Sequence, residues 1–272
     1  MDQTYAVLHN GVKMPFLGIG TFKATKAKEV KAAVQTALEL GYRHIDTAAI
    51  YQNEEFIGEE LQNNEVGREE IFLVSKVWNS DQGYQSTKKA FAESLERLRT
   101  DYLDLYLIHW PKKLNAETWK AMEELYREGK IKAIGVSNFL QHHLEELLKT
   151  AEIIPMVNQI EFHPRLVQPN LLKYCQEKKI QVEAWSPLMQ GDLAAVPKLA
   201  ELAAKYQKTP AQVVLRWNIQ MNVVTIPKSI HAERIQENAL IFDFALTDEE
   251  VAALTAVDEN FRYGPHPDHI NF

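Results

Sequence analysis

The chain has 272 residues, of which 46% are hydrophobic and 25% charged, and its formal net charge is −7. This length fits one (β/α)8 barrel or two smaller domains, and the composition excludes an intrinsically disordered chain. The acidic balance argues against nucleic acid or an anionic membrane as a partner.

Further features of the sequence narrow the class of protein. Cys175 is the single cysteine, so the chain can form no intramolecular disulfide. No apolar run approaches the roughly 18 residues of a membrane span. Residues 1–4 lack the basic stretch and apolar core that begin a leader peptide. We therefore expect a cytoplasmic protein in a reducing environment.

The first elements in the chain are predicted to form a β-hairpin followed by alternating strands and helices. An Asn-Gly pair at residues 10–11 lies between the runs 5–8 and 12–14, a pattern typical of a two-residue hairpin turn. Strands are then predicted at residues 16–19, 43–45, 71–75, 103–108, 133–136, 157–160, 181–184 and 223–226. Helices are predicted at residues 27–40, 54–62, 85–98, 116–127, 141–150, 169–178, 197–206, 210–219 and 232–240. Capping boxes beginning at Thr209 and Thr247 mark two helix starts.

Regular alternation of strand and helix predicts a parallel sheet, either closed into a barrel or open and doubly wound. An open nucleotide-binding sheet would need a glycine-rich phosphate loop after its first strand. The sequence from Gly18 and Gly20 has Lys23 where the third glycine belongs. No linker or shift in composition marks a domain boundary. The sequence therefore favours one (β/α)8 domain spanning residues 1–272.

Residues just beyond the carboxyl ends of the strands would face one mouth of such a barrel, where the active sites of these folds lie. In chain order they are Gly20, Thr21, Asp46, Tyr51, Lys76, His109, Ser137, Asn138, Gln159, Glu161, Trp185, Ser186, Lys228 and Ser229. Each alone has a plainer explanation as a turn, rim, solvated strand-end or core residue. An acid, a phenol, an amine and an imidazole on neighbouring strand ends favour a catalytic site.

Several motifs together resemble the aldo-keto reductase family, in the expected order between Gly18 and Asn238. They are Asp46-Thr47-Ala48 with Tyr51-Gln52-Asn53-Glu54, Val74-Ser75-Lys76-Val77-Trp78, Leu107-Ile108-His109-Trp110-Pro111, Gly135-Val136-Ser137-Asn138-Phe139 and Ile226-Pro227-Lys228-Ser229. The chain is most similar to compact bacterial members such as 2,5-diketo-D-gluconate reductase. The resemblance implies an α/β fold, a (β/α)8 TIM barrel, and NADPH-dependent, metal-free reduction of aldehydes and ketones to alcohols. Candidate substrates are small aldehydes, dicarbonyls, keto sugars and keto acids.

The resemblance also implies that Asp46, Tyr51, Lys76 and His109 form the catalytic tetrad. Hydride arriving at a carbonyl carbon leaves an alkoxide, so a proton donor and a positive field are needed at the oxygen. A free tyrosine has a pKa of about 10. We expect Lys76 to lower the pKa of Tyr51, Asp46 to keep Lys76 charged, and His109 to orient the carbonyl.

The cofactor site follows from the same resemblance. Lys228, Ser229 and Arg234 would hold the 2′-phosphate at a helix N-terminus, which attracts anions, and Glu237 and Asn238 would lie at the adenine. A neutral His231, where related enzymes can carry a basic residue, puts the strength of the NADPH preference in question. Near the nicotinamide and pyrophosphate we expect Gly20, Thr21, Asp46, Ser137, Asn138, Gln159, Trp185, Ser186, Pro187, Leu188, Gln190 and Gly191.

Substrate contacts are expected from Phe22, Trp78 and Trp110 beside Tyr51 and His109, because small-ligand sites are lined by apolar and aromatic side chains. The tail at residues 262–267 either folds across the entrance or forms a poorly ordered end. We expect a monomer with a small carbonyl substrate.

Two alternatives stay open. One is a nicotinamide-binding regulatory subunit without physiological turnover. The other is a metal-dependent hydrolase, for which the ligands are poor: His142 and His143 lack the H-E-x-x-H spacing, and His163, His266 and His269 are scattered in the sequence.

Overall fold

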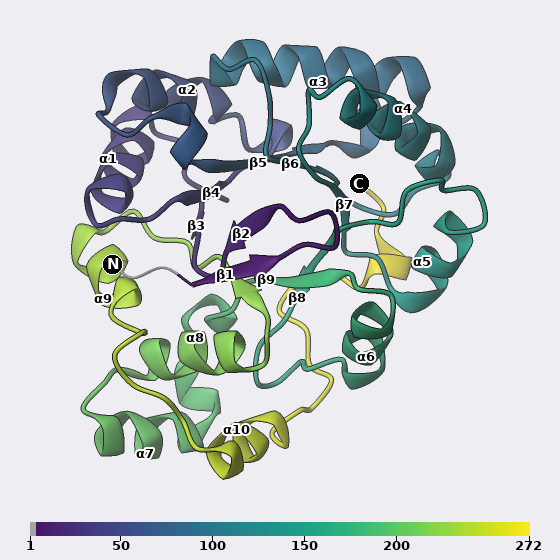
Figure 1. The fold of residues 1–272 in the computed structure, drawn as a ribbon. Helices are drawn as coiled ribbons and strands as arrows, with labels where there is room; N and C mark the ends of the chain where they lie inside the picture. Colours follow the sequence, from purple (N-terminus) through teal and green to yellow (C-terminus); the bar gives the residue numbers. More distant parts are fainter. Residues whose placement is uncertain (1–3) are drawn as a thin grey trace.

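The computed structural model describes residues 4–272; residues 1–3, on which part of the leader-peptide expectation rests, lie outside the described residues. Eight parallel strands are hydrogen-bonded in chain order. They are β3 (Ile19–Gly20), β4 (His44–Asp46), β5 (Phe72–Val77), β6 (Leu105–Ile108), β7 (Ile134–Ser137), β8 (Val157–Glu161), β9 (Gln181–Trp185) and β10 (Val224–Thr225). Bonds from Gly18 N to Thr225 O (2.9 Å) and from Gly20 N to Pro227 O (3.1 Å) join the first strand to the last. The sheet therefore closes, which confirms the predicted (β/α)8 barrel (Figure 1).

Helices surround the barrel and cover its outer face (Figure 1). They are α1 (Ala27–Glu39), α2 (Glu54–Asn63), α3 (Tyr84–Leu98), α4 (Asn115–Arg127), α5 (Gln141–Leu147), α6 (Pro169–Glu177), α7 (Pro197–Tyr206), α8 (Pro210–Gln220), α9 (Ala232–Ala239) and α10 (Asp248–Thr255). Both predicted capping boxes are present, since the hydroxyls of Thr209 and Thr247 each accept a backbone N–H three residues on. Helix α5 is shorter than predicted because the chain leaves it in a turn after Leu147.

The hairpin of β1 (Tyr5–Val7) and β2 (Lys13–Pro15) lies across one end of the barrel (Figure 1). Asn10 donates to the carbonyl of Lys132, which precedes β7, so the hairpin covers the amino ends of the strands. Its turn differs from the predicted two-residue type. Three residues connect Leu8 to Val12, and Gly11 takes the positive φ of 88° at the third of them. Asn-Gly thus specifies the hairpin but not its loop length, because three-residue loops also need a left-handed residue.

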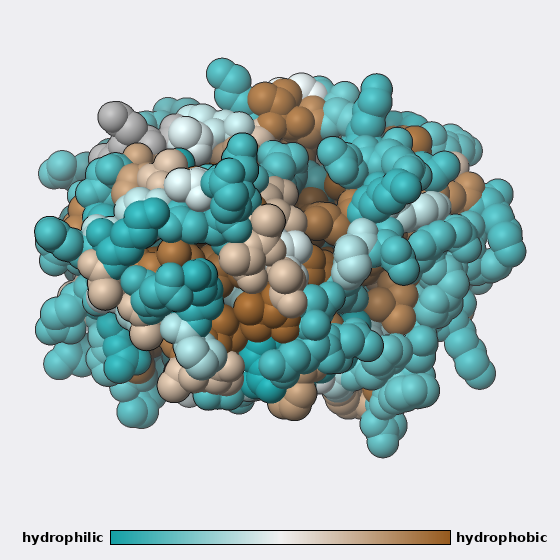
Figure 2. All heavy atoms as spheres, turned by 90° about the horizontal axis from the view of Figure 1, so that it is seen from below, coloured by the Kyte–Doolittle hydropathy of each residue, from teal (hydrophilic) through white to brown (hydrophobic). Residues whose placement is uncertain are grey.

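The outer surface is mainly polar, as expected for amphipathic helices packed on a barrel. In α1 the buried residues recur with helical spacing at Val30, Ala33, Val34, Ala37 and Leu38. Figure 2 shows the face on which α7 and α10 lie; hydrophilic side chains cover most of it and apolar ones gather near its centre. Within residues 4–272, no helix combines the length and apolar character needed to cross a membrane.

Candidate active site

A buried ion pair lies at the carboxyl ends of β4 and β5. The Lys76 ammonium donates to both oxygens of Asp46, at 2.7 and 2.8 Å, and to the carbonyl of Thr47 at 2.9 Å. Lys76 has no exposed surface. Asp46 is the last residue of β4, and adjacent parallel strands bring the two side chains to the same mouth. The predicted proximity of these two residues is therefore present.

The pair is charged despite its burial. Burial opposes a charge on Lys76, but the negative field and hydrogen bond of Asp46 outweigh it, so the pKa of Lys76 is raised. Thr21 fixes the backbone at Asp46 by donating from its hydroxyl to the backbone carbonyl of Asp46 at 2.9 Å. The site thus holds a fixed ammonium in surroundings that exclude water, where its field is felt strongly.

Tyr51 ends a short 3-10 helix, η1 (Ala49–Tyr51), and its ring centroid lies 5.2 Å from the Lys76 ammonium. Burial raises the pKa of Tyr51 and the Asp46 carboxylate adds to that effect, whereas the charge and hydrogen bond of Lys76 lower it. The net direction is upward. Lys76 therefore lowers the pKa of Tyr51 as expected, but desolvation outweighs the ammonium, so the phenol is not acidic in the protein alone. Tyr51 is held as a neutral phenol, the form that donates a proton.

The Tyr51 loop is fixed by Asn53, which the sequence indicated only as part of the Tyr51-Gln52-Asn53-Glu54 motif. Its amide donates to the carbonyls of Thr21 (3.0 Å) and Ala24 (2.9 Å), and its oxygen accepts from the Thr47 hydroxyl at 2.7 Å. Asn53 is fully buried. These bonds tie the loop after β3 to the loop after β4. The position of Tyr51 is therefore set by a buried amide rather than by loop packing alone.

His109, directly after β6, completes the group. Its ring lies edge-on to Tyr51, with centroids 5.7 Å apart, and edge-on to Trp78 at 5.0 Å. Burial and the nearby Lys76 charge hold the pKa of His109 well below its usual range, so the imidazole is neutral at pH 7. Nδ1 is buried without a hydrogen-bond partner among residues 4–272. The proton therefore belongs on Nε2, since a buried orphan acceptor is tolerated better than a buried orphan N–H.

A second group of predicted residues lies at the ends of β7, β8 and β9. Asn138 takes a left-handed backbone, φ 65°, and donates to the His109 carbonyl at 2.9 Å. Its oxygen accepts from the indole N–H of Trp185 at 2.8 Å. Ser137 donates to the backbone of Gln159 at 2.9 Å. Asn138 thus links the backbone of His109 to the half-buried indole of Trp185. The side chains of Ser137, Asn138, Gln159 and Trp185 form a shelf beside the ion pair.

Two buried residues at this site were missed by the sequence reasoning, Glu183 and His44. The amide nitrogen of Gln159 lies 2.8 Å from Asp46 Oδ2 and 2.8 Å from Glu183 Oε2. Glu183 Oε1 in turn lies 3.3 Å from His44 Nε2. The alternation of side chains between the two faces of a strand could have identified both residues. Each precedes a predicted site residue by two positions in its strand and so shares its face.

The predicted phosphate-binding residues lie around the last strand and α9. Lys228 and Arg234 are exposed. Neither makes an ion pair within the described part of the chain. Ser229 is nearly buried and its hydroxyl accepts from His231 N at 3.1 Å. Glu237 accepts from the Thr209 hydroxyl at 2.6 Å, and Asn238 is buried. Two unengaged cations therefore flank the N-terminus of a helix.

The loop after β9 carries the remaining predicted cofactor residues. Ser186 and Gln190 take left-handed backbone angles, φ 52° and 54°, as does Gly191 at 97°. Pro187 is buried and Leu188 half-buried. Gly20 lies across the closing seam, where a Cβ would come within 2.9 Å of the Ile226 carbonyl. The loop after β9 and the seam where β3 meets the last strand together border one side of the shelf.

Aromatic side chains line the mouth above the ion pair. The ring of Phe22 lies 5.1 Å from that of Tyr51 and is about half exposed. Phe272 stacks on Trp78 at 5.8 Å and lies edge-on to Trp110 at 5.5 Å. Sequence reasoning predicted Phe22, Trp78 and Trp110 here but missed Phe272, because nothing in its local sequence indicates where the tail ends.

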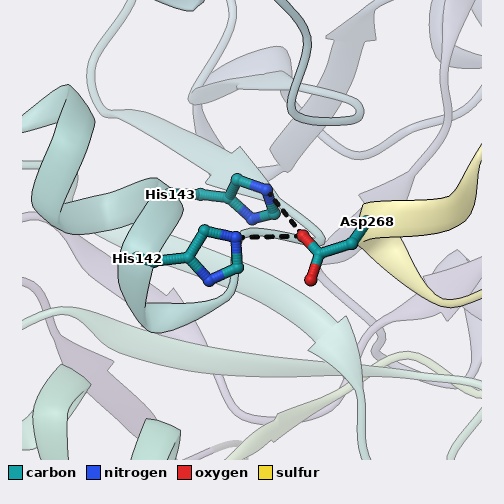
Figure 3. A group of neighbouring side chains, drawn as sticks. All are labelled: His142, His143 and Asp268. Atoms are coloured by element: carbon teal, nitrogen blue, oxygen red, sulfur yellow. Dashed lines mark hydrogen bonds and ion pairs between the residues drawn. The ribbon is translucent and has the colours of Figure 1, made fainter.

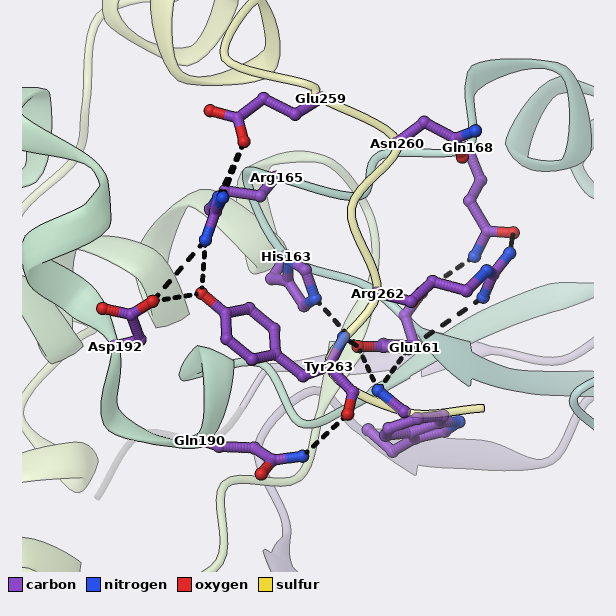
Figure 4. A network of polar contacts seen from close by, with 12 residues as sticks. Glu161, His163, Arg165, Gln168, Gln190, Asp192, Glu259, Asn260, Arg262 and Tyr263 are labelled. Carbon is purple, nitrogen blue, oxygen red and sulfur yellow. Dashed lines mark hydrogen bonds and ion pairs between the residues drawn. The ribbon is translucent and has the colours of Figure 1, made fainter. Parts of the chain in front are cut away.

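The tail folds back over the barrel, which settles the alternative left open for residues 262–267. Glu161, fully buried at the end of β8, accepts from the backbone of Tyr263 at 2.6 Å and of Gly264 at 3.2 Å. Tyr263 also donates to Asp192 at 2.8 Å and accepts from Arg165 at 2.8 Å (Figure 4). Gly264 packs so closely on the Trp185 indole that a Cβ would clash with it. The tail therefore presses on the shelf residue Trp185.

The tail brings Asp268 against His142 and His143, the two histidines that lack the H-E-x-x-H spacing. His142 Nε2 and His143 Nε2 lie 2.9 and 3.1 Å from the same oxygen of Asp268 (Figure 3). These three groups are close enough to hold a cation. However, His143 Nδ1 accepts the backbone N–H of Leu140 at 3.1 Å, which places the proton on Nε2. That proton faces Asp268, so the cluster is built as a hydrogen-bonded anchor for the tail.

Comparison with known proteins gives consistent results along the whole chain. The model of the Aldo/keto reductase family matches residues 16–259. Glyoxal reductase of Bacillus subtilis (strain 168) is 58% identical over 266 residues, which cover 97% of this chain and 96% of that protein. Methylglyoxal reductase DkgA of Escherichia coli (strain K12) is 45% identical over 274 residues, 99% of this chain and 98% of that one. The crystal structure of a Gox0644 mutant in complex with NADPH is 40% identical, with a TM-score of 0.94 over 100% of both chains.

Proposed function

The chain belongs to the aldo/keto reductase family, and from that premise we propose that it reduces small α-dicarbonyls and related aldehydes and ketones to alcohols with NADPH. Two similar proteins are named as reductases of glyoxal and methylglyoxal, which supports this substrate class. One observation carries the proposal: a neutral phenol and a neutral imidazole lie beside a buried, charged lysine–aspartate pair. Together these groups offer the proton donor and the positive field that a developing alkoxide needs.

The residues present fit a phosphorylated nicotinamide dinucleotide. Lys228 and Arg234 offer unengaged positive charge at the N-terminus of α9, where a phosphate is favoured. At the nicotinamide end of the site, the side-chain oxygen of Gln159, Oε1, receives no hydrogen bond from any residue between 4 and 272, and the indole of Trp185 offers a flat surface. When bound, the cofactor would supply hydride to the carbonyl carbon.

The chain's own groups would manage the proton and the charge. His109 Nε2–H would donate to the carbonyl oxygen and orient it. Tyr51 would transfer its hydroxyl proton to that oxygen as the hydride arrives. Lys76 would stabilise the phenolate left behind, and Asp46 would keep Lys76 protonated throughout. We take residues 1–272 as a single domain acting as a cytoplasmic monomer.

The test follows the loss of NADPH absorbance with glyoxal, methylglyoxal, a keto sugar and a keto acid, each repeated with NADH. We expect NADPH to be consumed with the dicarbonyls and NADH to serve less well. A regulatory subunit would instead bind NADPH, seen by quenching of tryptophan fluorescence, without consuming it. Binding with no turnover on any carbonyl would therefore replace the proposal with that alternative.

A further inference from the structure

A line of polar groups continues from the ion pair into the interior of the barrel, a region usually filled by apolar side chains. Glu183 lies in the middle of β9 and His44 begins β4; neither has any exposed surface. The His44 ring fills the space beside β3, since a Cβ on Gly18 would lie 2.7 Å from its Cγ. Buried polar groups carry a large free-energy penalty unless each is matched to a partner. Glu183 Oε2 accepts from Gln159 at 2.8 Å, whereas Glu183 Oε1 and His44 Nε2 lie 3.3 Å apart and neither has a hydrogen-bond partner among residues 4–272.

Gln159 is held by carboxyl groups on two sides. Its amide nitrogen donates one hydrogen to Asp46 Oδ2 and the other to Glu183 Oε2, each at 2.8 Å. The reversed amide would set the Gln159 oxygen against the Asp46 carboxylate, which is repulsive. Both N–H groups are thus engaged, and Oε1 is left for a donor from outside the described chain.

The hydrogen bonds of His44 determine where the next proton lies. His44 Nδ1 faces the carbonyl of Pro15 at 3.3 Å, and a carbonyl only accepts, so Nδ1 carries a proton. Nε2 of the neutral ring is then an acceptor, facing Glu183 Oε1 at 3.3 Å. Two acceptors this close repel each other, and a hydrogen on Oε1 removes that repulsion. The alternative, an imidazolium–carboxylate pair, would place two charges in the apolar interior and is disfavoured.

The charges around Glu183 agree with a neutral acid. The groups facing it are His44 and Asp46 from β4, Lys76 from β5 and Gln159 from β8. Burial, reinforced by the Asp46 carboxylate, raises the pKa of Glu183 to about 8. Burial likewise lowers the pKa of His44 to about 4. The one nearby cation, Lys76, is already matched by Asp46.

We propose that Glu183, held as a neutral carboxylic acid against His44, is a positioning residue that fixes the amide of Gln159 and presents Gln159 Oε1 to the carboxamide of the cofactor. The inference rests on the proposed function for the identity of that cofactor. Glu183 touches neither substrate nor cofactor and acts through Gln159 alone. Its neutral form also leaves Lys76 and Asp46 as a closed one-to-one pair.

Two variants separate this role from simple packing. Glu183→Gln keeps the shape and neutrality of the acid: its amide can donate to His44 Nε2 and its oxygen can accept from Gln159. Glu183→Leu keeps an apolar side chain of similar size but offers neither bond. We expect the glutamine variant to bind NADPH within about 2-fold of wild type and the leucine variant about 10-fold more weakly, the factor for about 1.4 kcal/mol. The pH profile of kcat should be unchanged in Glu183→Gln.

The protonation state of Glu183 can be measured separately, in the protein without cofactor. The infrared difference spectrum of wild type minus Glu183→Gln should show the carbonyl band of a protonated carboxyl group at pH 7. A carboxylate band in its place, or a glutamine variant that binds NADPH as poorly as the leucine variant, would overturn the inference. If Glu183→Leu does not fold, the infrared spectrum and the NADPH affinity of Glu183→Gln still test the inference. Failure of the proposed function would look different, since the wild type itself would then bind no NADPH.

Discussion

The Lys76 ammonium donates to both carboxylate oxygens of Asp46, at 2.7 and 2.8 Å, from a side chain with no exposed surface. Two desolvated charges at this distance depend strongly on each other, because either one alone would be left uncompensated in the interior. The pair therefore links the stability of the barrel to the electrostatics of the site. We expect stability and activity to respond differently when Asp46 is changed alone and when Asp46 and Lys76 are changed together.

The first prediction concerns this pair. Asp46→Asn should lower the free energy of unfolding by about 3–5 kcal/mol, because Lys76 is left buried without its counter-charge. Asp46→Asn with Lys76→Met should recover much of that stability while activity stays lost. Urea unfolding and kcat measure the two effects. As a control, Glu146→Gln breaks the exposed pair with Lys149 and should change stability by less than about 1 kcal/mol. Equal losses for Asp46→Asn and its control would contradict a structural role for the pair.

The pH dependence follows from the protonation of Tyr51 and His109. Burial raises the pKa of Tyr51 above its ordinary value of about 10, so the neutral phenol needed for reduction is present throughout neutral and mildly alkaline pH. Burial also holds the pKa of His109 well below its usual range. Reduction should therefore show no rate change near the ordinary histidine pKa, and oxidation of the alcohol, which needs the phenolate, should rise with pH. Initial rates in both directions test this, and a fall in reduction centred near pH 6.5 would count against a neutral His109.

Cofactor preference should depend on the two unengaged cations at α9. Lys228→Ala and Arg234→Ala are each expected to weaken NADPH binding about 10-fold, through loss of a charged contact to the 2′-phosphate. NADH, which lacks that phosphate, should bind about as before. Fluorescence titration with both cofactors gives the comparison. Lys198→Ala on α7, a half-exposed lysine paired with Glu201, serves as the control. Similar losses for NADPH and NADH would show that these residues do not read the phosphate.

The tail should influence the site through Gly264. Gly264→Ala places a methyl group against the Trp185 indole, so either the tail or the indole must move. We expect weaker NADPH binding and faster backbone hydrogen exchange over residues 261–272. Gly67→Ala is a matched control, because its methyl group would meet only the flexible end of the Glu69 side chain. If Gly264→Ala binds and exchanges like Gly67→Ala, the contact between tail and shelf has no role in binding.

The barrel could be predicted from the sequence because the signals for its strands and helices are local and recur in each strand–helix unit. Helical spacing in α1, proline and capping boxes at α8, and short apolar runs between helices each follow from the residues themselves. The rule that strand ends share one mouth then brought Asp46, Lys76 and His109 together. The hairpin loop length was wrong because Gly11 suits loops of two or three residues equally.

The remaining features depend on contacts between distant segments. Glu183 and Gln159 meet only when the barrel closes, and Phe272 reaches Trp78 only because Glu161 and Asp268 hold the tail. The pKa of Tyr51 was expected to fall, since Lys76 can be inferred from the motif. The depth of burial that outweighs Lys76 cannot be read from sequence. Proton placement on His143 likewise needed the Leu140 contact.

The central claim is that Tyr51 delivers the proton while the rest of the site binds and orients. Tyr51→Phe removes one hydroxyl, and Tyr174→Phe on α6 removes another at a distance from the mouth. Single-turnover reduction of glyoxal by bound NADPH is the most direct measurement. The account predicts a rate lower by about 10²–10⁴-fold in Tyr51→Phe, with NADPH affinity kept and Tyr174→Phe unaffected. A Tyr51→Phe variant that turns over like Tyr174→Phe would contradict it.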